Sequence, residues 1–555
     1  MATTIRAYAN CDHTYVVWRY DQRIPGLRGF ALRRRRGDAD PEVAGTWVGF
    51  EGQPAPPGTI KPSTEWPIQK FMWADLGVHP GDVVAYQAVP MVGAAGSLTA
   101  AEDQATPWTD ELTVEPHGSD GLAAYFNRGI VASQWLSRRL QEKAPGHEAT
   151  QLRTEIEDPT SPIRAFLSGP LRDRMLRLLD DVKAAAGHAY AVLFELDDPE
   201  LVPKLTELGD HAHVVLANGS EAGKDENAEA RAALKAAGVE VHDRMVASGH
   251  LAHNKFLAVC EPDGTPKMAW SGSTNWSKTG LCTQANNGIL IDSPTVAAQF
   301  RAQWDKLRDA GDEYPPSLLD ANDQRKDATV QGQEVDTWFV AARGEVDLAE
   351  GRELINAARE GILFLMFNPG PVDTLLNAIL DRTTEGTPTY DPSLYIHGVL
   401  NQDPSTSAHP VQLFHRGEQQ DANFDVVLPA AITEQLGNWV KELRQLPGTF
   451  AMVHSKIVLV DPFGETPIVM TGSHNLGPRA SGSNDDNLVI VHGSPDLAAA
   501  YAVNIIGVYN QYRWRFWRTQ NPSDDWTGLQ DNDTWQDDYF TGARARELRF
   551  WLGEG

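Results

Sequence analysis

Apolar and polar residues change their spacing several times along this chain of 555 residues. The first 115 residues hold short strand-like runs, such as "HTYVVWRY" and "VVAYQAVPMV", separated by turns rich in glycine and proline. Short strands joined by such turns are typical of an all-β sandwich. We therefore predict a β-sandwich domain over residues 1–116.

Two aromatic positions refine this prediction. Trp18 lies on an early strand and Tyr86 follows the turn "HPGD", a layout that resembles a fibronectin type III or immunoglobulin-like domain. The run "RRRR" at 33–36 could contact phosphate groups. We favour a solvated strand end or turn for it, because runs of charge usually face solvent.

The spacing then becomes helical and later alternates. Residues 120–187 carry apolar residues at helical spacing, in "GLAAYFNRGIVASQWLSRRLQEKA" and "PLRDRMLRLLDDVKAAAG". From "HAYAVLFEL" to "VEVHDRM", strand-like and helix-like segments take turns. This order predicts βαβ units and a parallel or mixed sheet.

The chain also repeats itself. "AHNKFLAVCEPDG" matches "VHSKIVLVDPFG", and "AWSGSTNWS" matches "VMTGSHNLG" about 200 positions later. A repeat this long indicates a duplicated α/β domain with pseudo-twofold symmetry, not a solenoid. We predict a first half over 117–320, a second over 321–515 and a polar linker near 313–336. An aromatic-rich tail, 516–555, should pack on the body.

Composition limits the partners and the compartment. The net charge of −27 repels nucleic acid and anionic membranes at long range, but local cations can outweigh it inside a cleft. No apolar run could span a bilayer, and the N-terminus lacks a secretory signal pattern. We expect a cytoplasmic protein, although a mature secreted form would look the same. Cys11, Cys260 and Cys282 form no disulfide or zinc pattern and should be core thiols.

The repeated segments each carry a histidine and a lysine two positions apart. Side chains alternate along a strand, so His253 and Lys255 share one side, as do His454 and Lys456. Each lysine is followed by Gly-Ser-x-Asn, in "GSTN" 272–275 and "GSHN" 472–475. One His-x-Lys pair is common by chance, whereas two complete sets at matching places of a duplication form a specific pattern.

These residue types suit phosphodiester cleavage. Lysine ammonium and asparagine amide groups donate hydrogen bonds to phosphate oxygens, and Ser273, Ser473 and nearby backbone N–H groups can add donors. A neutral imidazole can attack phosphorus while a protonated one donates to the leaving oxygen. The sequence has no His-Glu-x-x-His and no Cys-x-x-Cys motif. We therefore expect neither a metal nor a cofactor.

Over roughly residues 120–515, the chain resembles the phospholipase D superfamily, whose mark is His-x-Lys-x4-Asp followed by Gly-Ser-x-Asn, twice. The resemblance implies that His253 is a nucleophile that becomes phosphorylated and that His454 is the general acid. It also implies that four donors bind the phosphoryl group: Lys255, Lys456, Asn275 and Asn475.

Two departures from the family pattern bear on the carboxylates. The second motif has Asp461, but Cys260 takes that place in the first. Because Asp461 lies an odd seven positions after His454, it should face away and support the fold or a second shell.

The family often has an acid after Gly-Ser-x-Asn that backs the histidine of the opposite half. Here the second half supplies Asp485 and Asp486, whereas the first has Asn286 and Asn287. We predict that Asp486 orients His253, with Asp485 nearby, and that His454 meets an amide.

The sequence therefore predicts a two-lobed phosphodiesterase, with phospholipid hydrolysis or transphosphatidylation as the first expectation for its reaction. A nuclease of the same superfamily and a catalytically weak scaffold or binding protein are the alternatives. We expect a monomer that makes transient contact with a membrane surface. Glu195 ends a strand at an edge where sites form and could shape the pocket.

Overall fold

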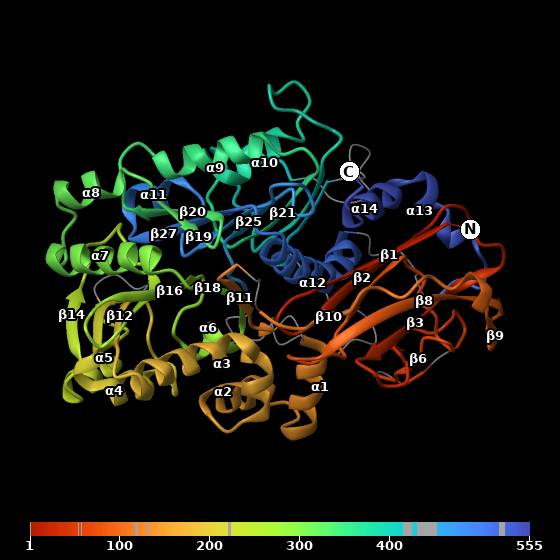
Figure 1. Ribbon diagram of the computed structural model, residues 1–555, viewed down its shortest axis with the longest axis horizontal. Helices are drawn as coiled ribbons and strands as arrows, with labels where there is room; N and C mark the ends of the chain where they lie inside the picture. Colours follow the sequence, from red (N-terminus) through yellow and green to blue (C-terminus); the bar gives the residue numbers. More distant parts are fainter. Residues whose placement is uncertain are drawn as a thin grey trace.

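The computed structural model describes residues 2–53, 55–56, 58–116, 120–129, 133–219, 224–413, 424–429, 452–520 and 528–554. These residues form a β-rich N-terminal region, two large mixed sheets with covering helices, and C-terminal helices that return to the N-terminal region (Figure 1).

The described strands of the N-terminal region are antiparallel and form two larger sheets, with strand orders β1-β2-β7 and β10-β8-β3-β4, and a small sheet of β5 and β6; β9 pairs with β8. Trp18 and Tyr86 are both buried in its interior. The predicted β-rich region is therefore present. Its strands are β1 Thr3–Ala9, β2 Thr14–Tyr20, β3 Leu27–Arg36, β4 Glu42–Val43, β5 Gly45–Thr46, β6 Lys61–Pro62, β7 Met72–Asp75, β8 Val83–Ala94, β9 Ser97–Ala100 and β10 Leu112–Thr113.

The four arginines at 33–36 close strand β3, as the strand-end interpretation expected. Each guanidinium faces a carboxylate of the same region, so the positive charges are compensated within it and are not presented to phosphate. The pairs are Arg33–Glu102, Arg34–Asp75, Arg35–Glu111 and Arg36–Asp82.

The first large sheet has the order β11-β18-β16-β15-β12-β13-β14. Strands β12, β13 and β14 are parallel and the other pairs are antiparallel, so the sheet is mixed, as the alternating pattern predicted. Its strands are β11 Leu122–Phe126, β12 His188–Leu193, β13 Ala212–Ala217, β14 Glu240–Arg244, β15 Lys255–Cys260, β16 Pro266–Gly272 and β18 Asn287–Ile291.

Seven helices accompany this sheet. Ser293 caps the helix over 294–310 and accepts a hydrogen bond from the Val296 N–H, and Pro294 at the first position fits the helix start. Residues 122–126 were predicted to be helical, which is wrong: "LAAYF" pairs with β18 and all five residues are buried. The helices are α1 Ser133–Lys143, α2 Glu148–Glu157, α3 Pro162–Ala184, α4 Leu201–Leu208, α5 Ala228–Ala236, α6 Lys278–Cys282 and α7 Pro294–Ala310.

The second large sheet has the order β19-β20-β27-β26-β25-β21-β22-β23. A linker was expected at 313–336, which is wrong, because helix α8, strand β19 and the start of β20 occupy these residues. Strand bounds are β19 Lys326–Val330, β20 Gln333–Val340, β21 Gly361–Met366, β22 Tyr395–Leu400, β23 Phe424–Val427, β25 Ile457–Val460, β26 Ile468–Gly472 and β27 Asp486–His492. The accompanying helices are α8 Pro316–Asn322, α9 Val346–Asn356, α10 Leu375–Asp381 and α11 Pro478–Ser483.

The two large sheets share one strand order. Read across the sheet, the order β11-β18-β16-β15-β12-β13-β14 corresponds strand by strand to β20-β27-β26-β25-β21-β22-β23. The parallel pairs occupy the same positions in both sheets. Strand β19 is the additional edge of the second sheet. The strands that follow the two His-x-Lys pairs, β15 and β25, therefore hold the same position in each sheet.

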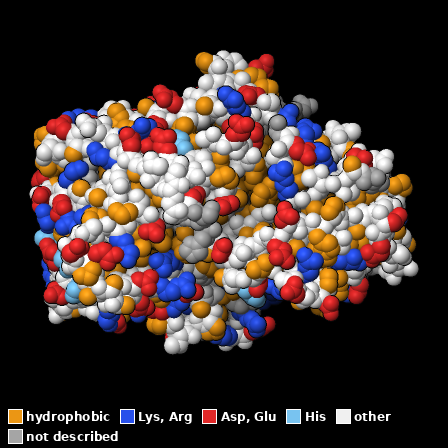
Figure 2. Space-filling model, viewed as in Figure 1, with side chains coloured by type: hydrophobic (Ala, Val, Ile, Leu, Met, Phe, Trp, Pro, Cys, Tyr) orange, Lys and Arg blue, Asp and Glu red, His pale blue; other side chains and the backbone are white. Residues whose placement is uncertain are grey.

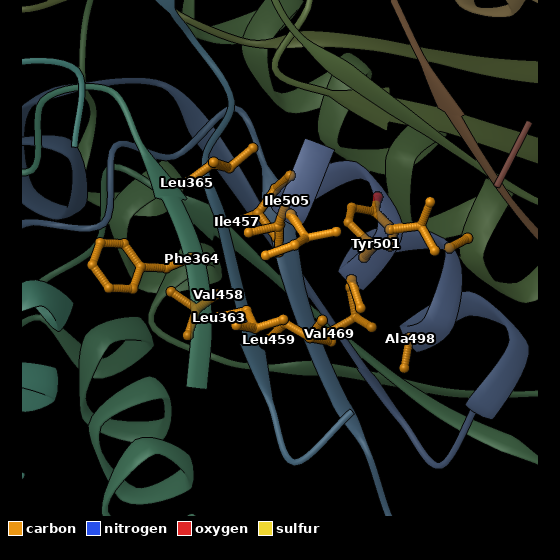
Figure 3. Packing of buried hydrophobic residues seen from close by; sticks show 14 of the residues in the cluster. Leu363, Phe364, Leu365, Ile457, Val458, Leu459, Val469, Ala498, Tyr501 and Ile505 are labelled. Carbon is orange, nitrogen blue, oxygen red and sulfur yellow. The ribbon is translucent and has the colours of Figure 1, made fainter. Parts of the chain in front are cut away.

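A long helix, α12 Pro495–Gln520, lies at the centre of the molecule (Figure 1). It contacts strand β1 of the N-terminal region, β11 of the first sheet and several strands of the second. In Figure 3, Tyr501 and Ile505 from this helix pack beside Ile457 and Val469 of the second sheet. The predicted domain boundary between 515 and 516 falls inside α12, so the tail does not begin there as a separate segment.

The described part of the tail carries helices α13 Asp538–Thr541 and α14 Ala543–Trp551. The ring of Trp551 lies 4.6 Å from that of Tyr15, and the ring of Phe550 lies 4.5 Å from that of Tyr395. The tail thus packs between the N-terminal region and the second sheet, where its aromatic residues add to the core.

Charges on the face shown in Figure 2 are mixed, with acidic and basic side chains interspersed. Within the described ranges, no helix has the length and apolar character needed to cross a membrane. All three cysteines are buried free thiols, as predicted.

Candidate active site

Short segments that precede the two motif strands bind each half to the other. The His253 N–H donates to the Asp485 carbonyl at 2.9 Å, and the His454 N–H donates to the Ala285 carbonyl at 2.9 Å. Beside the second contact, β17 Gln284–Ala285 pairs in parallel with β24 Met452–Val453. Backbone contacts of matching kind therefore hold both histidines at the junction between the halves.

His253 meets the predicted carboxylate. Its Nδ1 lies 2.8 Å from Asp486 Oδ1, and both side chains are buried. Because a carboxylate accepts, Nδ1 carries the proton and the lone pair is on Nε2. Burial lowers the pKa of His253 to about 4, although Asp486 opposes this shift. His253 is therefore a neutral imidazole above that pH, with Nε2 available.

His454 meets an amide, as the sequence predicted. Its Nδ1 lies 3.0 Å from Asn286 Oδ1 and 3.1 Å from the Ser273 carbonyl. Burial lowers the pKa of His454 well below its usual value, and Lys456, Lys255 and His253 lower it further. Because Ser273 belongs to the first motif, these contacts bring His454 of the second motif against the first.

Both lysines are buried and lie over phenylalanine rings. Lys255 Nζ is 4.7 Å from the centre of Phe194, and Lys456 Nζ is 4.9 Å from the centre of Phe367. Each ammonium also donates to the carbonyl of the histidine two residues earlier. Burial lowers the pKa of Lys255 to about 7, while Asp486 and Glu195 oppose the shift.

The same phenylalanines contact the histidines. Ring centres are 4.7 Å apart in both the Phe194–His253 and the Phe367–His454 pair. The sequence reasoning missed these two residues as parts of the site. A signal was present, because each ends a buried strand of the repeat, in "AVLFE" and "FLMFN".

The two motif asparagines differ in their surroundings. Asn275 Nδ2 donates to Glu195 Oε2 at 2.7 Å. The Oδ1 atoms of Asn275 and Asn475 are buried and have no partner among the described residues. Buried amide groups of this kind remain available for a ligand.

The motif serines contact the asparagines that follow each motif. The Ser273 hydroxyl donates to Asn286 Oδ1 at 2.7 Å and accepts from the Asn287 N–H. The Ser473 hydroxyl accepts from the Asn487 N–H at 3.1 Å. Both serines are fully buried. The Ser273 hydrogen is given to Asn286, whereas the expected support of phosphate by Ser473 stays a prediction.

Two asparagines that follow the motifs cross between the halves. Asn287 Nδ2 donates to Thr471 Oγ1 at 2.8 Å, and the Ser271 hydroxyl donates to Asn487 Oδ1 at 2.5 Å. Ser271 corresponds to Thr471 in the repeat, and Asn287 corresponds to Asn487. The two hydrogen bonds are therefore equivalent contacts, one from each half to the other. Asn287 thus helps to join the two halves, and its expected role in supporting the site stays a prediction.

The carboxylates of Asp485 and Asp461 contact groups other than the motif histidines and lysines. The Asp485 side chain forms a fully buried ion pair with Arg244. The Asp461 carboxylate accepts from the N–H groups of residues 359–361, where strand β21 begins. Asp461 therefore supports the fold, one of the two roles predicted. Its counterpart Cys260 is buried, and burial raises the pKa of the thiol to about 11.

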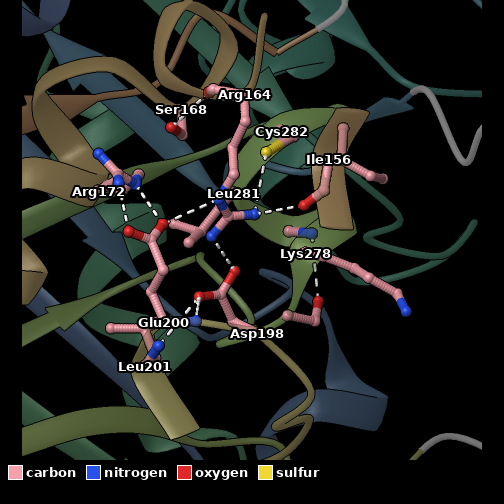
Figure 4. Close-up of polar contacts among 12 residues, drawn as sticks. Ile156, Arg164, Ser168, Arg172, Asp198, Glu200, Leu201, Lys278, Leu281 and Cys282 are labelled. Atoms are coloured by element: carbon pink, nitrogen blue, oxygen red, sulfur yellow. Dashed lines mark hydrogen bonds and ion pairs between the residues drawn. The ribbon is translucent and has the colours of Figure 1, made fainter. Parts of the chain in front are cut away.

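A buried ion-pair network supports the first motif from behind (Figure 4). Arg164 on α3 donates to Asp198 Oδ2 at 2.6 Å and to the Ile156 carbonyl at 2.6 Å. Asp198 in turn accepts from the first N–H groups of α4. The Asp198 N–H donates to the Trp276 carbonyl, which joins this loop to the residue after Asn275.

One group of metal-ligand residue types lies elsewhere among the described residues. Atoms of Asp336, Glu350 and His492 lie within 4.8 Å of one another. The Arg325 guanidinium already contacts this group, at 2.6 Å from Glu350 Oε1 and 3.4 Å from Asp336 Oδ2. A side-chain cation thus lies against both carboxylates, and His492 is at the opposite end of β27 from Asp486.

Comparisons with known proteins match the segments that carry both motifs. A family profile described as "Cardiolipin synthase, PLD-like domain" matches residues 178–308 and 405–507. A mitochondrial cardiolipin hydrolase from Danio rerio is 25% identical over 219 residues, which are 36% of this chain and 90% of the relative.

Solved structures show weaker overall similarity. A phosphatidylserine synthase from Haemophilus influenzae has 11% identity and a TM-score of 0.41, over 69% of this chain and 91% of that chain. Nuc from Salmonella typhimurium, a phospholipase D family member, has 17% identity and a TM-score of 0.22, over 33% and 97%. The profile match falls on both segments that carry the duplicated motif, so these segments are similar to a PLD-like domain, in agreement with the predicted resemblance to the phospholipase D superfamily.

Proposed function

We propose that this chain is a metal-independent phosphodiesterase that acts through a phosphohistidine, with a phospholipid as its substrate. The observation that carries the proposal is the pairing of the two histidines across the halves. Asp486 of the second half contacts His253, and Asn286 of the first half contacts His454. Two buried lysines lie beside these histidines. A single anion at the junction would neutralise this cluster of potential cations.

The first step forms a bond from His253 to phosphorus. The negative charge of the bound phosphate raises the pKa of His454, so that this histidine is protonated on both ring nitrogens in the complex. Nε2 of His253 attacks in line, the bond from phosphorus to the leaving oxygen breaks, and that oxygen takes the proton from His454 Nε2. Asp486 stabilises the positive charge that forms on His253. Lys255 and Lys456, when protonated, stabilise the added negative charge on the phosphoryl oxygens.

The second step releases the product. Water, or an alcohol in a transfer reaction, attacks phosphorus and gives its proton to His454. The phosphorus–nitrogen bond breaks and its electron pair returns to His253 Nε2. Both histidines then have their starting protonation states, so the cycle is balanced.

The choice of a phospholipid rests on the names of the family profile and of the relative. The matching profile is described as a cardiolipin synthase domain, and the curated relative is a cardiolipin hydrolase. A phosphatidyl diester with a glycerol-type leaving group is therefore the substrate we favour. A substrate in a bilayer requires transient contact of the protein with that surface.

We also propose how the two halves are arranged and that a single chain is sufficient for activity. The shared strand order of the two sheets and the reciprocal contacts support pseudo-twofold related halves, and both half-sites in one chain allow a monomer to act. We assign the N-terminal region to the fibronectin type III-like sandwiches on the basis of its two antiparallel sheets.

Turnover of bis-p-nitrophenyl phosphate in the presence of a chelator tests the chemistry. We expect wild-type turnover to persist with chelator and His253→Ala to lose at least about 10²-fold. His242→Ala is the matched control, because His242 pairs with Glu240 away from the site and should keep full activity. Loss of turnover on chelation, or full activity of His253→Ala, would contradict the proposal.

Two further measurements test the intermediate and the substrate. Acid-quenched protein should carry a phosphoryl group on His253 by mass spectrometry. A panel of cardiolipin vesicles, phosphatidylcholine vesicles, and single- and double-stranded DNA should show lipid cleavage. Cleavage of DNA alone would identify a nuclease instead.

A further inference from the structure

The two halves of the site differ where strands β12 and β21 end. Phe194 and Phe367 occupy equivalent places, since each lies 4.7 Å from its histidine ring. The residue after Phe194 is Glu195, whereas the residue after Phe367 is Asn368. One half therefore presents a carboxylate where the other has an amide.

Glu195 is joined to the first motif loop by side-chain and backbone contacts. Its Oε2 accepts from Asn275 Nδ2 at 2.7 Å, and its carbonyl accepts from the Trp276 N–H at 3.1 Å. Leu196 forms an isolated β-bridge with Trp276, so the two segments run side by side. Asn275 itself is buried.

This contact fixes the direction of the Asn275 amide. One N–H of Nδ2 points at Glu195, and because an amide is planar, the second N–H and Oδ1 have set directions. Oδ1 has no partner among the described residues. In the orientation that Glu195 selects, the second N–H remains to donate to a phosphoryl oxygen.

Glu195 also acts on the lysines. Its negative charge, together with that of Asp486, opposes the lowering of the Lys255 pKa by burial. Glu195 has the same effect on Lys456. Burial raises the pKa of Glu195, with Glu226 and Asp197 adding to the shift and Lys255 opposing it.

We propose that Glu195 is a positioning residue of the phosphodiester site, which aims the Asn275 amide and holds Lys255 in its charged form. This inference rests on the proposed function. It gives both tasks to a residue of the first half, because Asn368 is uncharged, and the Glu195 charge also acts on Lys456 of the second half. The first half then supplies the preset donors, and the second half completes the site.

Glu195→Gln tests the electrostatic task, because it keeps the shape and removes the charge. Without that charge, Lys255 loses its proton at lower pH, so the alkaline limb of the kcat/KM profile moves down by about one pH unit. Activity should fall about tenfold at pH 8 and change less than about twofold at pH 6. A structural role alone would lower activity equally at both.

Glu195→Asp separates the aiming task. It keeps the charge but shortens the side chain, so the alkaline limb should stay near its wild-type position while kcat/KM falls about equally at every pH. Glu207→Gln is the matched control, since Glu207 is an exposed carboxylate of the same half that pairs with Lys183. Its profile should match the wild type in position and height.

Orthovanadate binding by isothermal titration calorimetry gives a readout without turnover. Glu195→Gln should bind vanadate about tenfold more weakly than wild type at pH 8 and similarly at pH 6. An unshifted profile in an active Glu195→Gln variant would overturn this inference and leave the proposed function standing. A wild type that neither turns over nor binds vanadate would overturn the proposed function itself.

Discussion

At the scale of single residues, the two histidines share burial but not partners. Asp486 gives His253 a negative neighbour, and Asn286 gives His454 a neutral one. A carboxylate stabilises the cation that forms when His253 bonds to phosphorus, whereas a neutral partner leaves His454 a stronger acid. The difference suits a nucleophile on one side and a proton donor on the other.

Asp486→Asn should change both the rate and the pH profile. The pKa of His253 is about 4, so kcat/KM should be lost as pH falls through that value, where the nucleophile takes up a proton. The aspartate opposes the lowering of this pKa, so its removal should move the acid limb to still lower pH. The plateau should fall about 10²-fold because the cation loses its partner.

A pH–rate series on wild type and variant, with protein circular dichroism at each pH, measures both effects. Asp461→Asn is a control, since that carboxylate binds the backbone at the start of β21. It should leave the profile in place. An acid limb that moves up in Asp486→Asn would count against the assigned contact.

At the scale of elements, loops that follow β12 and β16 carry Glu195 and Asn275. Helix α3 supports both through Arg164, which is fully buried with Asp198. Asp198 caps α4, and its N–H binds the Trp276 carbonyl. The loops therefore take their shape from an ion pair that lies outside the site.

Arg164→Met should lower both stability and activity. It leaves Asp198 buried without its charged partner, a loss of about 3–5 kcal/mol in the free energy of unfolding. Denaturant titration measures that loss, and kcat/KM should fall because the loops lose their support. Lys183→Ala on the same helix removes an exposed pair with Glu207 and should cost less than about 1 kcal/mol. Equal costs for the two variants would contradict this account.

At the scale of the whole molecule, the halves are joined by reciprocal contacts and by a buried ion pair. Arg244 ends β14 of the first half, and Asp485 precedes β27 of the second. The Asp485 carbonyl also accepts the His253 N–H. The contact between halves and the geometry of the site therefore depend on the same residues.

Arg244→Ala should destabilise the junction by about 3–5 kcal/mol, because it leaves Asp485 buried without a partner. Activity should fall with it, since the backbone that holds His253 is displaced. Lys235→Ala, which removes an exposed contact with Asp243 on the same strand, should leave both unchanged. Thermal melting and turnover of the two variants measure the difference, and a stable, fully active Arg244→Ala would refute the coupling.

Much of this organisation could be predicted from the sequence, because it is written in local periodicity and in repetition. The β-rich start, the mixed sheet and the two His-x-Lys sets needed only spacing along the chain. The helix predicted for residues 122–126 is wrong. "LAAYF" fits a helix locally, but pairing with the free edge of β18 makes it a strand. The predicted linker is also wrong, because the polar residues at 326–336 form a hairpin at the edge of the second sheet.

By itself, the sequence determined which groups could do chemistry: two imidazoles, two ammonium groups and two carboxamides at matching places. Only the tertiary structure decided what each group contacts. It placed Phe194 and Phe367 under the lysines, took the motif serines into the loops, and set Glu195 against Asn275. Spacing along a chain fixes the side on which a residue lies, whereas its partner and its pKa depend on burial and on charges from distant segments.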